Sequence, residues 1–299
     1  MADTDTPLSN ERRQDDYYTT VPCFIMHMKK HTHRYDRMNE LMKSLGFKNY
    51  KFIEPYPATE ETKKLLEKQL NSKSSAISLS QASHFMTYLS ILQDNNFNDI
   101  FIIEDDLKLI YHLGITKSIL NFCVNNYPSD TDMMYFEFIN DCETLDENKD
   151  FTKLKSPVCT ACIYYPSKEV RTKIVNSISN YAINHNENLT SSDITIASLI
   201  SKNEINAYAH IQLFTQDHTL ISSIEGSLKN ELPVCLNEKY KLFRNSYYNT
   251  EQTNIIKEKY AFNIGLENTN NKNYGLKIVL LLSIIIIIGV IIYVTYRKK

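Results

Sequence analysis

Apolar and amphipathic segments alternate along the first hundred residues of the chain. Runs of β-branched and aromatic residues indicate buried strands, whereas apolar residues spaced three and four apart indicate helices. In order, we expect a strand at 21–28, a helix at 34–45 ending at Gly46, a strand at 51–53, a helix at 59–70, a helix that begins at Ser78 or Ser80, and a strand at 100–103. This order favours an α/β fold with a mostly parallel central sheet and helices on both faces.

The elements expected after residue 130 are shorter. We expect strands at 132–139, 158–165 and 210–214, a helix at 167–182, and a helix from about Ser191 to Ile200. Ser and Asp are ordinary N-cap residues, so capping is the simplest role for Asp193 at the start of the last helix.

The strand at 100–103 runs directly into three acids, Glu104, Asp105 and Asp106. Open α/β sheets bind ligands beyond the carboxyl ends of their strands, where adjacent carboxylates can hold a divalent cation against a phosphate. Three neighbouring acids repel one another in a buried turn unless a cation or hydrogen-bond donors offset their charge. The stretch therefore predicts a metal and diphosphate site, with a solvated acidic turn as the alternative.

Composition narrows the class of protein and partner. The 299 residues, 42% hydrophobic and 23% charged, suffice for one large or two modest globular domains. A net charge of -2 gives no electrostatic reason to expect nucleic acid as a partner. The cysteines are irregularly spaced and suggest no disulfide framework, and we interpret Cys159 and Cys162 as strand residues rather than a metal or redox pair.

The two ends of the chain differ in character. Residues 1–20 are polar, so we expect a loose tail rather than a secretory signal. The uncharged apolar run 278–294 nearly spans a hydrocarbon core of about 30 Å at about 1.5 Å per residue. We therefore expect a single transmembrane helix at 275–296, preceded by a domain edge and polar stalk at 226–274 and followed by a basic tail at 297–299.

The position of this helix predicts a topology. Since no signal peptide precedes it, we expect a tail-anchored membrane protein whose N-terminal domain is cytosolic. The terminal charges Arg297, Lys298 and Lys299 favour the lumenal alternative, in which Asn188 would lie in a glycosylation motif.

Three short blocks share their order and spacing with a known family. They are His27-Met28 with Arg34 and Met38 seven and eleven residues after His27, Ser83-His84 with Tyr88, and the apolar strand that ends in Glu104-Asp105-Asp106-Leu107. Together they resemble the family 25 glycosyltransferases, which include bacterial lipopolysaccharide galactosyltransferases and collagen hydroxylysine galactosyltransferases.

Weaker matches extend the resemblance over residues 21–225, including Ala161 to Ser167, Asp193, and Gln216 with Ser222 to Ile224. The chain also departs from the family. His27 replaces an Asn, Leu79 falls where a Gly is usual, and Tyr135-Phe136-Glu137 replaces a more apolar strand.

The resemblance implies a GT-A fold, in which an acidic motif holds Mn(II), or Mg(II), against the diphosphate of a UDP-sugar. It implies that Asp105 and Asp106 are the metal ligands, and that His27, Arg34, Glu104 and Asp105 contact the nucleotide. A surface ion pair with Asp36 or Glu40 is the alternative for Arg34.

The family's inverting chemistry needs a general base for the acceptor hydroxyl. Asp193 is the first candidate, and Glu137 and Asp141 are reserves. We expect His84 to pack between helix and sheet and to order the acidic loop by a hydrogen bond, with direct catalysis as the alternative. His218 is either a further metal ligand or an ordinary loop histidine.

Two functions from different classes follow. The first is a membrane-anchored, metal-dependent glycosyltransferase that moves a hexose, galactose or glucose, from a UDP-sugar to a glycan, lipid-linked or protein acceptor. The second is a catalytically degenerate relative that serves as a membrane or envelope binding protein, which the departures at His27, Leu79 and Glu137 suit.

Overall fold

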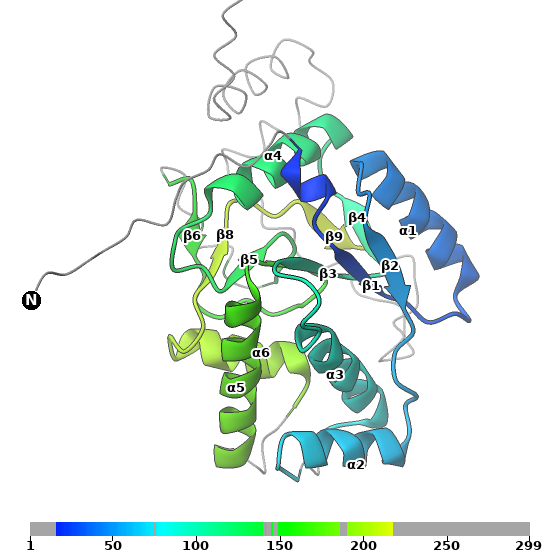
Figure 1. The fold of residues 1–299 in the computed structure, drawn as a ribbon, viewed down its shortest axis with the longest axis vertical. Coiled ribbons are helices and arrows are strands. Elements are labelled where there is room, and N and C mark those ends of the chain that lie inside the picture. Colours follow the sequence, from blue (N-terminus) through cyan, green and yellow to red (C-terminus); the bar gives the residue numbers. More distant parts are fainter. Residues whose placement is uncertain are drawn as a thin grey trace, which may run out of the picture. The chain divides into compact units, whose positions relative to one another are not determined.

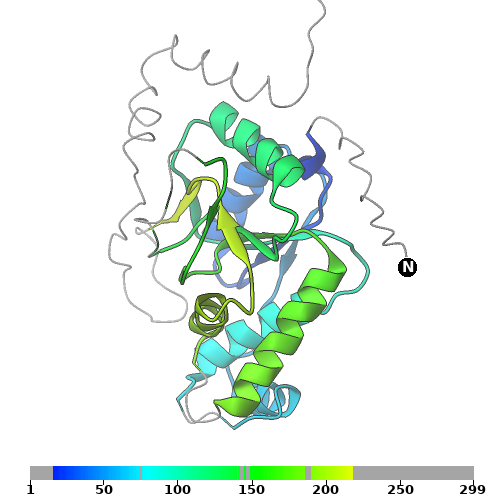
Figure 2. The same cartoon turned by 90° about the vertical axis from the view of Figure 1, so that its left-hand side faces the viewer.

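The computed structural model of the protein describes residues 16–73, 76–139, 141, 145, 149–185 and 190–217. Within them, a seven-stranded sheet of order β2-β1-β3-β7-β5-β8-β6 lies between two layers of helices (Figure 1; Figure 2). Its strands are β1 (Cys23–Met26), β2 (Tyr50–Ile53), β3 (Ile100–Glu104), β5 (Met133–Tyr135), β6 (Thr152–Lys153), β7 (Cys162–Tyr165) and β8 (Ala207–Ala209).

Five of these seven strands run in one direction. β2 and β3 are parallel to β1, and β8 is parallel to β5. β7 lies antiparallel between β3 and β5, so those two strands share a direction, and β6 is antiparallel to β8. The expected α/β fold with a mostly parallel, helix-flanked sheet is confirmed.

The helices divide unequally between the two faces of the sheet. α1 (Thr32–Leu45) and α4 (Leu113–Asn126) cover one face, with the short 3-10 helix η1 (Tyr17–Thr19) against α4. α2 (Glu60–Gln69), α3 (Leu79–Leu92), α5 (Lys168–Asn184) and α6 (Ser192–Ser201) cover the other face. The core lies between these layers, and each of the four residues of β3 before Glu104 is at most 1% exposed.

Local signals in the sequence set several helix ends. Gly46 ends α1 with φ of 90°, in the left-handed region that glycine adopts without strain. Ser78 opens α3 with a capping box, in which its hydroxyl accepts from the backbone N–H of Gln81 and the Gln81 side chain accepts from the Ser78 backbone. Thr59 caps α2 and Ser167 caps α5, each through a hydroxyl that accepts a backbone N–H of the first turn.

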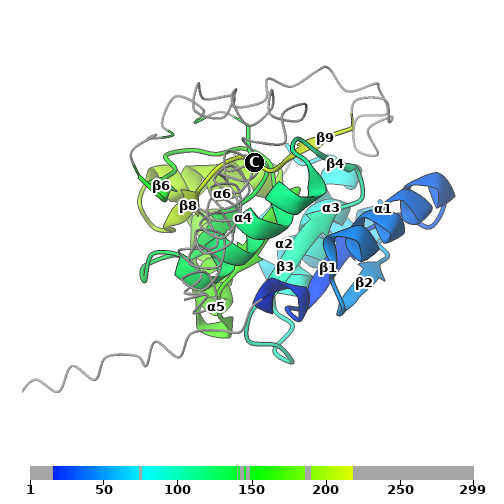
Figure 3. The same cartoon turned by 90° about the horizontal axis from the view of Figure 1, so that it is seen from above.

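A second sheet follows the acidic stretch. β4 (Leu107–Leu109) pairs antiparallel with β9 (Phe214–Gln216), and the two strands lie side by side in Figure 3. Asp105 and Asp106 form the turn between β3 and β4. The chain therefore leaves the main sheet at the acids, and the strand that follows them, β4, pairs with β9.

The expected strand at 210–214 is wrong. The backbone N–H groups of Leu213 and Phe214 both donate to the carbonyl of Phe136, and the carbonyl of Leu213 accepts from Ile110. The segment is a buried corner that carries the chain from β8 to β9, so its apolar residues reflect burial rather than a strand ladder.

Two other expected strands are shorter than predicted. The strand at 132–139 is regular only over β5, after which Ile139 makes an isolated bridge with Val158. The strand at 158–165 is regular only over β7, because Cys159 has φ of 99° and breaks the extended backbone. α4 was not predicted, since Gly114 and its asparagines weaken the local helical signal.

Several predicted segments lie outside the described residues. These are most of the tail at 1–20, the end of the domain beyond residue 217, the stalk at 226–274, the transmembrane helix at 275–296 and the basic tail at 297–299. Of the helices in the described ranges, none has the length and apolar character needed to cross a bilayer.

Candidate functional site

The acidic turn after β3 is buried. Asp105 is 6% exposed and Asp106 is 4% exposed, so the alternative of a solvated acidic turn is wrong. A buried carboxylate is costly unless nearby cations and donors compensate its charge. The partners of these two acids therefore define the site.

Two side chains from the first βα unit hold the carboxylate of Asp105. Nδ1 of His27, directly after β1, lies 2.8 Å from Oδ2 of Asp105, and Nη1 of Arg34, in the first turn of α1, donates to Oδ1 over 2.7 Å. The same Nη1 atom is 4.0 Å from Oδ2 of Asp106. His27 and Arg34 are 4% and 2% exposed, so Arg34 is not the surface partner of a neighbouring helical acid.

A second arginine of α1 contacts both the turn and the residue that follows β9. Nη2 of Arg37 donates to the carbonyl of Asp105 over 3.1 Å, and Nη1 pairs with the carboxylate of Asp217. The backbone N–H of Asp217 donates to the carbonyl of Asp106 over 2.7 Å. His218, the next residue and a predicted possible metal ligand, lies outside the described residues.

Glu104 is held on the opposite side of the turn. Nε2 of His84, from α3, lies 3.3 Å from Oε1 of Glu104, and the hydroxyl of Thr160 donates to the same oxygen over 3.1 Å. Nδ1 of His84 is 3.1 Å from the hydroxyl of Ser192, the first residue of α6. His84 thus contacts the acidic stretch, as expected from the sequence.

The pKa of His84 reflects these surroundings. Burial alone lowers the pKa of the imidazole, but the hydrogen bond and charge of Glu104, together with the charges of Asp193 and Asp106, raise it above 6.5 on balance. Asp193, half-buried beside Ser192 in the first turn of α6, is therefore close enough to act electrostatically on the site.

The two reserve bases have other surroundings. Burial raises the pKa of the Cys159 thiol, and the charges of Glu137, which is 1% exposed, and of Glu104 raise it further. Asp141 accepts from the backbone N–H groups of Lys155 and Ser156 through Oδ2, which gives it a role in holding a loop. Of the three candidates, Asp193 is the one whose charge acts on His84, which contacts the acidic stretch.

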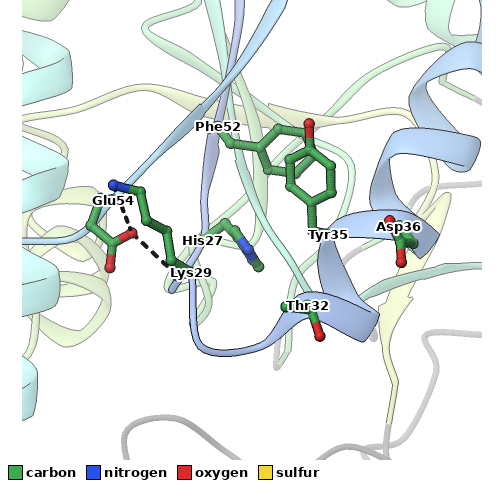
Figure 4. A pocket seen from close by; sticks show the side chains of 7 residues that line it. All are labelled: His27, Lys29, Thr32, Tyr35, Asp36, Phe52 and Glu54. Atoms are coloured by element: carbon green, nitrogen blue, oxygen red, sulfur yellow. Dashed lines mark hydrogen bonds and ion pairs between the residues drawn. The ribbon is translucent and has the colours of Figure 1, made fainter.

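Two cavities share His27 in their walls, and one of them is lined by the acidic turn. One, of about 180 Å³, is lined by all three acids together with Lys30, Arg34 and His84 among others. The other, of about 300 Å³, is lined by His27, Lys29, Thr32, Tyr35, Asp36, Phe52 and Glu54 (Figure 4). We call the first the acidic cavity and the second the aromatic cavity.

The aromatic cavity is built from one flank of α1 and the end of β2. The rings of Tyr35 and Phe52 lie 4.3 Å apart between centroids, and the His27 ring is 5.4 Å from that of Phe52. Lys29 and Glu54 form its polar edge, where the Lys29 backbone N–H donates to Glu54 over 3.2 Å (Figure 4). Tyr35 is 41% exposed, so an aromatic face remains accessible to a planar ligand.

The carboxylates fit a divalent cation that is shared with a ligand. Within the described ranges there is no group of three or more His, Cys, Asp or Glu side chains arranged to hold a metal by themselves. Mg(II) and similar hard cations are commonly held by one or two carboxylates, with phosphate oxygens and water completing the shell. Asp105 and Asp106 are the residues that would hold such a cation, with His27 and Arg34 orienting the carboxylate of Asp105.

Several residues of the site were missed in the sequence. Tyr35 and Phe52 were assigned only to a helix and a strand, Thr160 only to a strand, and Ser192 only to the start of a helix. Lys30 was assigned no role. A signal existed for Arg37, because it lies one helical turn after Arg34 and so shares its face. Asp217 carried no local signal, since it reaches the turn through the pairing of β9 with β4.

Comparison of the chain with known proteins identifies no family to which it belongs. No protein-family model matches the chain, and no curated protein matches it significantly. The functional assignment therefore rests on the acidic turn, its cations and the two cavities.

Proposed function

We propose that the protein is a metal-dependent GT-A-type glycosyltransferase that moves a hexose, galactose or glucose, from a UDP-sugar to a glycan, lipid-linked or protein acceptor. The observation that carries the proposal is the pair of adjoining cavities at the carboxyl ends of β1 and β3. One cavity is aromatic and the other is rich in carboxylates and cations, which suits a planar base joined to a diphosphate.

The diphosphate would occupy the acidic cavity. Lys30 and Arg34 line it, so side-chain cations are available to phosphate oxygens. The uracil ring would pack on Tyr35 and Phe52 in the aromatic cavity. His27 lines both cavities and would mark the junction of nucleoside and diphosphate.

Asp106, supported by Asp105, would hold Mn(II) or Mg(II) at this site. The bound cation would supply Lewis-acid stabilisation of the charge that develops on the departing diphosphate. The residues of the chain have separate roles in the same step. Arg34 orients the carboxylate of Asp105, and Glu104, fixed by His84 and Thr160, borders the sugar side of the acidic cavity.

Asp193 is the proposed general base. Its carboxylate would accept the proton of the acceptor hydroxyl as that oxygen bonds to the anomeric carbon, while the bond from this carbon to UDP breaks and UDP leaves with the electron pair. Attack opposite the leaving group inverts the anomeric configuration. In this proposal the transmembrane helix at 275–296 anchors the enzyme, with the catalytic domain in the cytosol or, alternatively, the lumen.

The test is UDP release by the full-length chain, purified in detergent, from a panel of UDP-sugars with and without Mn(II). We expect turnover of one donor that requires the metal and is lost in Asp106→Asn. Asp130→Asn is the matched control, because Asp130 is exposed and precedes β5, at the opposite end of the strands. Turnover that persists in Asp106→Asn, or that is absent in the wild type, would contradict the proposal.

One observation favours the second function, a binding protein that has lost catalysis. His27 and Arg34 together compensate the charge of Asp105 through protein contacts alone. Such a protein would show neither turnover nor metal-dependent binding of any nucleotide, so titration of UDP with and without Mn(II) separates the two functions.

A further inference from the structure

His84 joins two elements that otherwise meet the site separately. Nε2 of its ring is 3.3 Å from Glu104 at the end of β3, and Nδ1 is 3.1 Å from the hydroxyl of Ser192 at the start of α6. One ring nitrogen thus lies within ion-pair distance of the acidic stretch, and the other is within hydrogen-bond distance of the helix that carries Asp193. A histidine whose two nitrogens both face fixed partners has a defined ring orientation.

The surroundings keep this bridge rigid. The His84 ring stacks on Tyr88 of the same helix, with ring planes 17° apart, and Tyr88 is fully buried. Thr160 fixes the oxygen of Glu104 that faces His84. Ser192 is 1% exposed, so water does not compete for its contact with the imidazole.

A Ser-His-Glu arrangement can also indicate a nucleophilic serine, but the burial of Ser192 excludes that chemistry here. Its hydroxyl is inaccessible, and Ser192 is not part of the wall of the acidic cavity, whereas His84 and Glu104 are. The bridge therefore acts within the protein rather than on a substrate.

We propose that His84 is a positioning residue that sets the location of Asp193 relative to the acidic turn, acting through Ser192. This inference rests on the proposed glycosyltransferase function. The distance between a base and the leaving group decides whether the acceptor oxygen is aligned for attack, and a displacement of about 1 Å can lower a rate by about 100-fold. Loss of the bridge should therefore slow the chemical step and leave donor binding intact.

Two substitutions separate the two ends of the bridge. In His84→Asn the side-chain amide lies near the position of Nδ1 and can still bond Ser192, whereas in His84→Gln the amide reaches the position of Nε2 and Glu104. Ser192→Ala removes the helix end of the bridge without touching the acidic cavity. His185→Gln is the control, because His185 contacts Lys202, which follows the far end of α6.

The experiment measures UDP release to water by the full-length chain in detergent, using the donor that the wild type turns over fastest with Mn(II). We expect kcat to fall about 10- to 100-fold in His84→Gln and Ser192→Ala, with KM changed by less than about 3-fold. His84→Asn, which keeps Ser192 but loses Glu104, should lower kcat as well, whereas His185→Gln should retain kcat within about 3-fold. Far-UV circular dichroism and UDP affinity with Mn(II) check that each variant is folded and binds donor.

The outcomes separate this inference from the proposed function. A wild type without turnover overturns the function, and the inference with it. An active wild type whose kcat is unchanged in Ser192→Ala, or unchanged in both His84→Asn and His84→Gln, overturns the inference alone. A fall in UDP affinity that accounts for the loss of rate also overturns it, since His84 would then act on donor binding.

Discussion

Replacement of Arg171 by alanine tests how the structure holds the start of β3. The Arg171 side chain, from α5, is fully buried and donates to four backbone carbonyls, those of Leu92, Asp94, Phe97 and Asn98. Leu92 ends α3, and the other three acceptors lie in the loop that leads into β3. One guanidinium thus orders the connection between the helix that carries His84 and the strand that ends in the acids.

The magnitude follows from the carbonyls that alanine would leave behind. Each hydrogen bond from a buried cation contributes about 1.5 kcal/mol or more, but water that enters the space left by Arg171 would recover part of it. At about 1 kcal/mol for each carbonyl, the free energy of unfolding should fall by about 4 kcal/mol. Arg171→Lys should recover only part of this loss, because an ammonium cannot reproduce the planar fork.

Urea unfolding of the full-length chain in detergent measures this change, followed by far-UV circular dichroism because the chain contains no tryptophan. Lys168→Ala is the control, since Lys168 is exposed one helical turn earlier on α5. A loss below about 1 kcal/mol for Arg171→Ala would refute the reasoning, because it would mean that these carbonyls find equivalent partners without the guanidinium.

Three further predictions concern the site. Arg34→Gln should lower the free energy of unfolding by about 3 kcal/mol and weaken UDP binding with Mn(II), because Asp105 loses its buried cation; unchanged urea unfolding and calorimetry would contradict this. Tyr35→Ala should weaken UDP about 10-fold by calorimetry but leave pyrophosphate unchanged, and an equal loss for both ligands would place the base elsewhere. The pKa of His84 is raised above 6.5, so protonated His84 stabilises the fold; this contribution is complete below pH 6.5 and is lost as the pH rises through the raised pKa. Urea unfolding of the metal-free wild type should show that decline in stability. A His84→Gln variant with the same pH slope would count against this prediction.

The parts of the fold that were predictable are those fixed by nearby residues. The strand before the acids, the glycine end of α1 and the serine start of α3 depend on apolar runs and on caps within four residues, and all three are confirmed. The direction of β7 was not predictable, because a strand of four buried residues has the same pattern whether it runs parallel or antiparallel.

The candidate site shows the same division. The acids were identified from their place after a buried strand, and His27 and Arg34 from the family resemblance. The structure brings His27, Arg34 and Asp105 into direct contact. Asp217 was not identified from the sequence, since its approach to the turn depends on the pairing of β9 with β4. The strand predicted at 210–214 failed for a related reason, because burial at a corner between two sheets resembles the pattern of a strand.

The contacts that hold the acidic turn join residues far apart in the sequence, which has a consequence for folding kinetics. His27 and Asp105 are 78 positions apart, His84 and Ser192 are 108 apart, and Arg37 and Asp217 are 180 apart. Such contacts form late, since the entropy of closing long loops opposes them until the sheet is assembled. During synthesis, Arg37 of α1 cannot pair with Asp217 until β9 has left the ribosome. Until then, the acidic turn lacks some of its native contacts. The nascent domain should therefore depend most on chaperones or bound ligand in that interval.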